Sequence, residues 1–197
     1  EKGNNEISSA IWSALKGKGY VEEIIVSTEQ KSWQQALGDN PLVNLDNRLT
    51  LNKQQALAFS QLLYQEGFNV WLLEGVTGSG KTEIYLQYIE EVLKKGKQIL
   101  VLVPEIGLTP QTVRRFQARF NVEIDVLHSN LNDTQRLNVW ERARTGQSAI
   151  VIGTRSALFT QFSDLGLIIL DEEHDGSFKQ QDGWRYHARD LGIVLAR

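Results

Sequence analysis

The chain alternates between short apolar runs and longer stretches in which apolar residues recur every three or four positions. The first pattern is typical of strands buried on both faces, and the second is typical of amphipathic helices. The predicted strands cover residues 70–73, 98–103, 122–127, 149–152 and 165–170. The predicted helices cover residues 52–66, 83–95, 109–120 and 131–144. This alternation predicts an α/β fold, a mostly parallel sheet covered by helices on both faces.

The first part of the chain has a weaker pattern. Residues 6–16 predict a short helix, and residues 20–28 predict a strand or the arm of a hairpin. Two such elements are too small to bury a core by themselves. Turn-forming residues around Pro41 indicate a boundary. We therefore divide the chain into residues 1–45, a small α+β remnant or a linker packed on the next unit, and residues 46–197, the main α/β unit.

A phosphate-binding loop comes after the first predicted strand, where residues 75–82 read Gly-Val-Thr-Gly-Ser-Gly-Lys-Thr. This is the pattern G-x-x-x-x-G-K-[ST] between a strand and a helix, the context that the loop requires. Glycines let the backbone wrap round a polyphosphate, and the positive end of the next helix faces the same anion. Lys81 is expected to reach the terminal phosphates, and Thr82 is expected to bind Mg²⁺. The expected nucleotide contacts are Gly75, Thr77, Gly78, Ser79, Gly80, Lys81 and Thr82.

A group of acidic residues ends the last predicted strand, where residues 167–170 lead into Asp171, Glu172 and Glu173. Ligands of open α/β sheets bind at the carboxyl ends of the strands, so these carboxylates are expected near the phosphate loop. Asp171 is predicted to hold Mg²⁺, and Glu172 to orient and deprotonate the attacking water. Acidic residues also end strands because they face solvent, and this alternative fits Glu173. The pairing with a phosphate loop favours a catalytic site for ATP hydrolysis.

The phosphate loop combined with Asp171-Glu172-x-His174 resembles the DExH-box helicases and translocases of superfamily 2. Three further phrases resemble motif Ia, motif Ib and the aromatic-rich loop of one family among them, the bacterial primosomal replication-restart DNA helicases. These phrases lie at residues 103–111, 153–159 and 178–190. The resemblance runs from about residue 49 to residue 197 and implies a RecA-like P-loop NTPase lobe, the first of two. It also implies that residues 1–45 are the end of a winged-helix domain.

The chemistry of these phrases fits contacts with a DNA strand. Thr109 and Thr154 offer hydroxyls and Arg155 offers a fork-shaped cation, all suited to phosphate oxygens. Capping is the alternative for the two threonines, although a capping residue can also touch DNA. The contacts expected of the aromatic-rich loop are Phe178, Lys179, Trp184, Arg185 and Tyr186. Aromatic residues interleaved with cations suit stacking on unpaired bases, and packing of Trp184 and Tyr186 on the domain surface is the alternative.

A few other polar residues have competing interpretations. Gln55 resembles the glutamine near the adenine site of related helicases, and an exposed helix residue without a role is the alternative. His174 stands within the Asp-Glu-x-His phrase, so we expect it to relay the state of the nucleotide to another part of the enzyme. His128 and Ser129 are second-line candidates for DNA contact.

Composition changes this picture only slightly. A net charge of −3 and a pI of about 5.7 do not indicate nucleic-acid binding, but a local basic face is sufficient. The helix at 109–120 carries such a face, at Arg114, Arg115 and Arg119. No apolar run reaches the roughly 20 residues of a membrane span, so we expect no membrane partner and a cytoplasmic protein. The absence of cysteine excludes disulfides and thiolate metal sites in this chain.

The resemblance implies an ATP-dependent 3′-to-5′ DNA helicase that acts at stalled replication forks, in replication restart and primosome assembly. The implied cofactors are ATP and Mg²⁺, with zinc only in the family's second-lobe region. The implied partners are single-stranded and forked DNA, other primosome proteins and single-strand DNA-binding protein. The chain has no methionine even at position 1, so we expect a piece of a longer protein. A second lobe completes the active site of such motors, so this chain alone is expected to hydrolyse ATP weakly or not at all.

Two other interpretations stay open at this point. One is a nucleotide-dependent switch or binding module that does not move along nucleic acid. The other is a different superfamily 2 translocase, of the RNA or restriction type.

Overall fold

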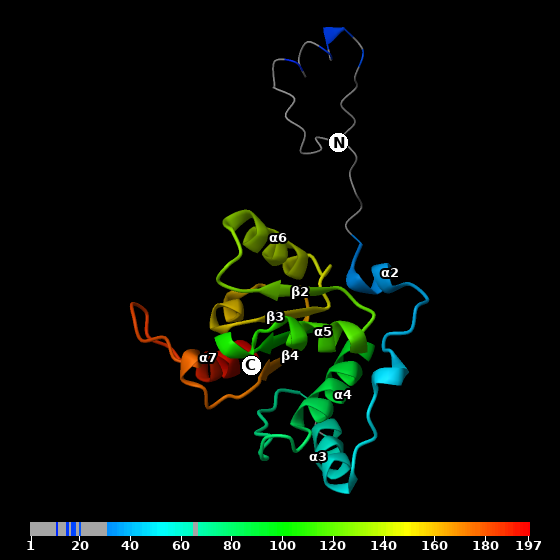
Figure 1. Ribbon diagram of the computed structural model, residues 1–197, viewed down its shortest axis with the longest axis vertical. Helices are drawn as coiled ribbons and strands as arrows, with labels where there is room; N and C mark the ends of the chain where they lie inside the picture. The colour runs from blue at the N-terminus through cyan, green and yellow to red at the C-terminus, as the bar shows by residue number, and fades with distance from the viewer. Residues whose placement is uncertain (1–10, 12–14, 16, 19, 21–30, 65–66) are drawn as a thin grey trace.

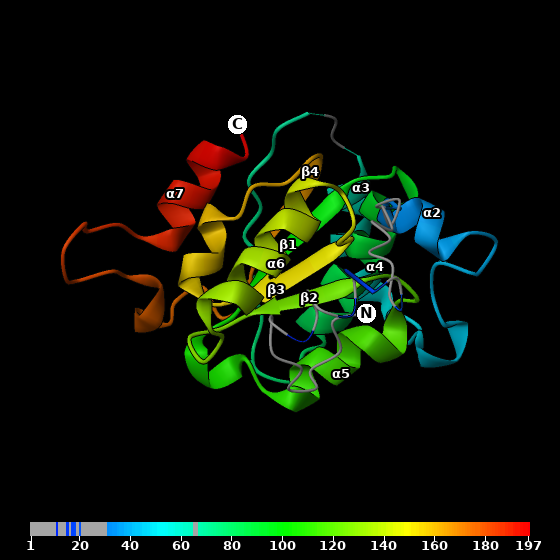
Figure 2. The same cartoon turned by 90° about the horizontal axis from the view of Figure 1, so that it is seen from above.

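The computed structural model describes residues 31–64 and 67–197, together with residues 11, 15, 17, 18 and 20. Its centre is a four-stranded sheet with the order β2-β3-β1-β4, in which every pairing is parallel (Figures 1 and 2). The strands are β1 (Gln98–Leu102), β2 (Ile124–Leu127), β3 (Ile150–Gly153) and β4 (Leu165–Leu170). The four strands predicted after the phosphate loop are therefore confirmed.

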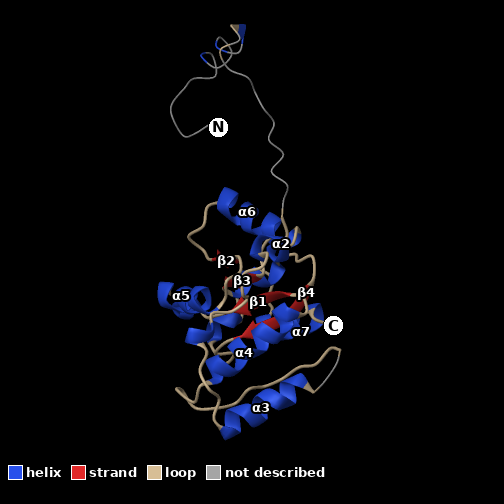
Figure 3. Ribbon diagram, turned by 90° about the vertical axis from the view of Figure 1, so that its right-hand side faces the viewer, coloured by secondary structure: helices blue, strands red, loops and turns tan. Residues whose placement is uncertain are grey.

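Helices pack on both faces of this sheet, as the alternation of elements predicts (Figure 3). The described helices are α2 (Trp33–Leu37), α3 (Lys53–Leu63), α4 (Lys81–Lys94), α5 (Pro110–Arg119), α6 (Asp133–Arg144) and α7 (Ala188–Leu195). The described 3₁₀ helices are η1 (Leu45–Asn47), η2 (Glu105–Gly107), η3 (Arg155–Phe159) and η4 (Gly176–Phe178). None of the helices in this part of the chain is long and apolar enough to cross a membrane.

Strand β1 lies inside the sheet, and its buried side chains alternate between two cores. Ile99 and Val101 pack in the core that α2, α4 and α5 cover. Leu100 and Leu102 pack in the core that α6, η3, η4 and α7 cover. Each fully buried side chain of this size contributes about 1.5–3 kcal/mol. The continuous apolar run thus reflects a strand with helices on both sides.

The strand predicted at residues 70–73 is wrong. Residues 69–76 form no helix or strand, and the exposed fractions of Val70, Trp71 and Leu72 are 58%, 42% and 74%. Figure 3 shows the segment after α3 running back past that helix instead of joining the sheet. A strand needs a partner for its backbone hydrogen bonds, and the four described strands pair only with one another. An apolar run becomes a strand only where the fold supplies a neighbouring edge.

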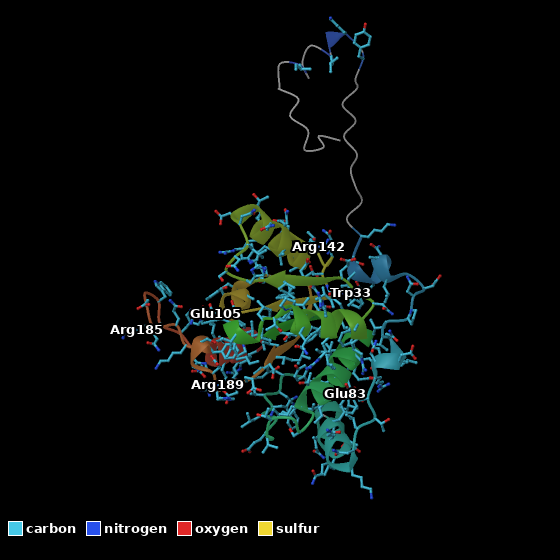
Figure 4. All side chains as sticks on the ribbon, viewed as in Figure 1. Trp33, Glu83, Glu105, Arg142, Arg185 and Arg189 are labelled. Carbon is cyan, nitrogen blue, oxygen red and sulfur yellow. The ribbon has the colours of Figure 1, made fainter. Side chains whose placement is uncertain are left out.

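Part of the N-terminal region packs on the α/β unit. The helix predicted at 6–16 and the strand predicted at 20–28 lie outside the described residues, apart from a few isolated positions. Trp33 is buried beside the sheet (Figure 4), and its N–H donates to the Gly146 carbonyl at 2.8 Å. Val43 forms an antiparallel bridge with Phe120. Residues 33–43 therefore pack as the linker interpretation requires, and the domain division at residue 45 stays a prediction.

Candidate nucleotide-binding and DNA-binding site

The phosphate loop leads directly into α4. Gly78 and Gly80 have φ angles of 79° and 84°, a conformation that residues with a Cβ rarely adopt. Because α4 begins at Lys81, the first free N–H groups of the helix face the loop. The Lys81 Nζ donates to the carbonyls of Gly75 at 2.5 Å and Val76 at 3.2 Å. Its ammonium group therefore lies within the loop, and its contact with the terminal phosphates stays a prediction.

Gln55 joins this loop to the start of α3. Its Nε2 donates to the Ser79 carbonyl at 2.8 Å, and its Oε1 accepts from the Asn52 N–H at 2.8 Å. A Cβ on Gly80 would meet the flexible end of the Gln55 side chain, which can move aside, so the φ of 84° is the reason for the glycine there. The Ser79 Oγ is buried with no hydrogen-bond partner in the described part, so the loop has an unsatisfied group for a ligand. Contact between Gln55 and adenine stays a prediction.

Tyr85 connects the phosphate-loop helix to the end of β4. Its hydroxyl donates to the Asp171 Oδ2 at 3.0 Å, and the Thr82 side chain is close enough to this hydroxyl to affect its pKa. Burial, and then the negative charge of Asp171, raise the pKa of Tyr85 far above its usual value, and the Thr82 contact opposes this rise. The phenol therefore stays protonated and holds the two predicted Mg²⁺ ligands near each other.

Thr82 and Asp171 offer donors that fit Mg²⁺. The ion prefers hydroxyl, carboxylate, phosphate and water oxygens, and usually takes only one or two ligands from protein. Among the described residues, no group of three or more His, Cys, Asp or Glu side chains is placed to hold a metal ion. The site thus fits a Mg²⁺ that arrives with nucleotide phosphates.

Glu172 adopts a strained backbone conformation directly after the strand. Its φ is 52°, which makes it the one non-glycine residue with positive φ in the described part of the chain. Such a conformation costs about 1–3 kcal/mol and is common at functional sites. The Glu172 carboxylate is 48% exposed and lies 3.6 Å from the His174 Nε2, which is 78% exposed. The predicted base and relay residues therefore contact each other at the surface, and their catalytic roles stay predictions.

A buried ionic network ties α4 to α5. The Arg119 Nη2 lies 3.2 Å from Glu83 and 3.9 Å from Glu90, and its Nη1 donates to the Asn47 carbonyl at 2.7 Å. Gln87 donates to the same Glu83 oxygen at 2.8 Å. Because Glu83 lies in the first turn of α4, the network fixes the helix end that carries the phosphate loop. Arg119 is only 1% exposed, so its predicted place on a basic surface is wrong.

The two threonines with predicted DNA contacts differ in accessibility. Thr109 is exposed and caps α5, since its Oγ1 accepts from the Thr112 N–H at 3.2 Å. The capping alternative for Thr109 is therefore confirmed. Thr154 precedes η3 without a side-chain cap and is only 9% exposed. Their contacts with DNA stay predictions.

Arg155 supports the aromatic-rich loop through its backbone. The Arg155 Nη1 donates to the Ser177 carbonyl at 2.7 Å and the Lys179 carbonyl at 2.9 Å. Its guanidinium also lies 5.9 Å from the centre of the Tyr186 ring, and the Phe159 ring packs edge-on against that ring at 5.3 Å. Arg155 thus holds the loop that comes after Asp171, whereas its direct contact with a phosphate stays a prediction.

The aromatic-rich loop has a buried base and an exposed tip. Phe178 is fully buried in the core, so its predicted stacking on DNA is wrong. Trp184 is 94% exposed, and Arg185 next to it lies on the part of the loop that protrudes in Figure 4. A cavity of about 480 Å³ is lined by Lys179, Gln180, Gln181, Arg185, Tyr186 and His187. The loop therefore offers an aromatic side chain and cations to a ligand.

Comparison with known proteins identifies the family of this chain. Residues 52–196 match the DEAD/DEAH box helicase family. The chain belongs to that family. Among curated relatives, the Replication restart protein PriA of Haemophilus influenzae is 81% identical over all 197 residues, which cover 27% of that protein. PriA of Bacillus subtilis is 42% identical over 97% of the chain, covering 24% of that protein. The chain thus spans about a quarter of the length of these relatives.

Two solved structures also resemble this DEAD/DEAH box helicase chain. The structure of RecG bound to a three-way DNA junction has a TM-score of 0.57 and 27% sequence identity. The match covers 71% of the present chain and 20% of the RecG chain. The UvsW helicase from bacteriophage T4 has a TM-score of 0.53 and 18% sequence identity. The match covers 94% of the present chain and 64% of the UvsW chain. The second likeness concerns the fold alone. Both support a RecA-like fold.

Two contacts of the site in this DEAD/DEAH box helicase were not predicted from the sequence, the one made by Tyr85 and the one between Arg119 and Glu83. Tyr85 lies three positions after Thr82 in a predicted helix, and residues at that spacing share a face. That spacing was the available signal. The pairing of Arg119 with Glu83 has no such signal, because the two residues lie on different helices and meet only through packing.

Proposed function

We propose that this chain is the first ATP-binding lobe of a DNA helicase that acts at stalled replication forks. The observation that carries the proposal is the Tyr85 bridge, which joins Thr82 of the phosphate loop to Asp171 at the end of β4. A phosphate loop and a strand-end carboxylate held together are the parts that bind and hydrolyse a Mg²⁺–nucleotide. Membership of the DEAD/DEAH box helicases supports the same activity.

Each residue of the site has a proposed part in the reaction. Lys81 now bonds to its own loop, and it exchanges these carbonyls for the terminal phosphates of ATP. Thr82 and Asp171 would hold Mg²⁺, which supplies positive charge to the phosphate oxygens. Glu172 orients the attacking water and accepts its proton. His174, in contact with Glu172, passes the state of the nucleotide outward.

The DNA partner is proposed from the aromatic-rich loop. Arg155 joins motif Ib to this loop, and the loop comes directly after the candidate catalytic residues in the chain. A DNA strand that binds Trp184 and the nearby cations can therefore shift the loop and the strand end together. The relative named Replication restart protein PriA supports a role in replication restart, and a RecG structure that contains a DNA junction supports DNA over RNA.

The remaining parts of the proposal rest on the resemblance of the sequence motifs to the replication-restart helicases. Movement along single-stranded DNA runs 3′-to-5′, the protein works in the cytoplasm, and its partners include forked DNA, primosome proteins and single-strand DNA-binding protein. A second lobe supplies the arginine that stabilises the transition state in such motors. Hydrolysis by this chain alone is therefore expected to be slow.

The nucleotide part is tested by binding of a fluorescent ATP analogue to residues 1–197. Lys81→Ala is expected to weaken binding at least tenfold in the presence of Mg²⁺, because the ammonium contacts the phosphates. Lys95→Ala at the other end of α4 is exposed and removes the same charge, so it serves as the matched control. Equal binding by the two variants would contradict the proposal. Anisotropy with DNA and RNA strands of one sequence then separates a DNA motor from an RNA motor.

A further inference from the structure

A groove of about 360 Å³ is lined by residues from the end of β2, from α6 and from η3. Figure 1 shows where these three elements lie in the fold. It shares no lining residue with the phosphate loop or with the cavity of the aromatic-rich loop. Because β2 and β3 are parallel, the groove lies at the carboxyl edge of the sheet, where ligands of open α/β sheets bind. Its volume falls within the range of small-molecule sites, roughly 300–1,000 Å³.

Aromatic side chains and one unpaired hydroxyl line this groove. Trp140 of α6 is 36% exposed and Phe159 of η3 is 50% exposed. Thr160 also lines the groove; it is 7% exposed, and its Oγ1 has no hydrogen-bond partner in the described part. Exposed aromatic patches mark binding sites, and a buried hydroxyl without a partner is costly. The groove therefore has the features of a site for a flat apolar ligand with polar edges.

The charges in the groove distinguish between kinds of ligand. Arg136 and Asp133 both line it, and neither side chain has a hydrogen bond or an ion pair within the described residues. The carboxylate of Asp133 repels a phosphate or a peptide carboxylate. Every neutral, unpaired nucleobase offers acceptors to an arginine and at least one N–H donor to a carboxylate. The pair of charges thus favours a base over an anion.

The groove is continuous with the candidate DNA contacts. Its wall η3 begins at Arg155, which holds the aromatic-rich loop. The Phe159 side chain lines the groove and also packs against Tyr186 of that loop at 5.3 Å. His128, a second-line candidate for DNA contact, lines the groove at the end of β2. A strand that contacts these residues passes the mouth of the groove.

We propose that this groove binds one unpaired base of the DNA strand. The base stacks against the exposed aromatic side chains of Trp140 and Phe159, and Arg136 and Asp133 bind its edge. Stacking on aromatic side chains tolerates any base, so the groove takes a base without selecting a sequence. The proposal rests on the DNA binding proposed above and deepens it. It adds to the phosphate contacts a site that grips the strand by a base.

The proposal is tested by measuring how the protein binds two single DNA strands of equal length. One strand consists of thymidines, and the other has the same backbone without bases. The measurement is fluorescence anisotropy with residues 1–197. Trp140→Leu is expected to weaken binding of the thymidine strand about tenfold, within the contribution of one stacked base, and to leave the abasic strand unchanged. Tyr64→Leu is the matched control, because Tyr64 is an 87% exposed aromatic residue outside the groove.

The arginine is tested in the same assay. Arg136→Gln is expected to weaken binding of the thymidine strand more than that of the abasic strand. Arg144→Gln removes the same charge from the same helix outside the groove, so it is expected to affect both strands equally. A second readout is photo-crosslinking with a strand that contains 5-iodouracil. Crosslinked peptides are expected to carry Trp140 or Phe159.

Three outcomes would overturn the base site. In the first, crosslinks are confined to residues 179–187 and Trp140→Leu binds both strands as Tyr64→Leu does. This result would support the proposed DNA binding but show that the groove takes no part in it. A change in sedimentation of Trp140→Leu without a change in DNA binding would assign the groove to a second copy of the chain. Failure of wild type to bind either strand would overturn the base site and the DNA binding together, while the ATP test stays independent.

Discussion

Removal of the buried Arg119 side chain tests how the phosphate-loop helix is held. Arg119→Met keeps much of the apolar volume but leaves Glu83 without its cationic partner. Breaking a buried ion pair from one side costs about 3–5 kcal/mol. The lower end applies here, because Glu83 keeps the Gln87 hydrogen bond at 2.8 Å and Glu90 keeps Lys94 at 2.9 Å. We therefore expect a loss of about 3 kcal/mol in the free energy of unfolding.

For a domain of this size, that loss lowers the melting temperature by about 6–12 °C. Urea unfolding followed by circular dichroism measures the free energy directly. Arg114→Met is the control on the same helix, and it should stay within about 0.5 kcal/mol of wild type because Arg114 is not buried. Adding Glu83→Gln to Arg119→Met should recover at least about 1 kcal/mol, because the stranded charge is removed. A loss no larger than that of Arg114→Met would refute the reasoning.

Three further changes test other parts of the site. Tyr85→Phe removes a hydrogen bond to a carboxylate, so the Mg²⁺ concentration for half-maximal nucleotide binding should rise roughly tenfold; an unchanged value would contradict the bridge. Glu172→Gly should raise the free energy of unfolding by about 1 kcal/mol, because glycine relieves the positive φ, and Glu172→Gln should leave it unchanged. Both changes should abolish DNA-stimulated ATP hydrolysis when a second lobe is present. Arg155→Lys should speed chymotrypsin cleavage at Trp184 about tenfold, since a single ammonium cannot replace the fork-shaped contacts; an unchanged rate would show that the loop does not depend on Arg155.

The sequence was sufficient wherever a local pattern decides the structure. The run at 98–103 has no polar interruption after Gln98, and it becomes the buried strand β1. The helix predicted from residue 52 also forms, because Asn52 caps α3 and Gln55 completes a capping box. The turn from the phosphate loop into α4 was predictable for the same reason, because its glycines act through backbone geometry within a few residues. The strand expected before the loop does not form.

Local patterns failed wherever a distant neighbour decides the outcome. Residues 70–73 have the composition of a strand but no partner edge in the described fold. Phe178 belongs to an aromatic phrase, but it is buried in the same core as Leu100 and Leu158, which come from other parts of the chain. Arg119 has the pattern of a surface cation until the carboxylates of another helix surround it. Periodicity carries no information about such pairings.

The edges of the sheet have a consequence for handling the protein in solution. Within the described sheet β4 is an edge strand, and its sequence Leu-Gly-Leu-Ile-Ile-Leu contains no charge. The opposite edge, β2, contains Asp125, which binds Arg142 at 2.8 Å. Proteins usually protect edge strands with charges, bulges or cover, because an open apolar edge recruits strands from other molecules. We therefore expect concentrated samples of this chain to self-associate through β4, which light scattering would detect.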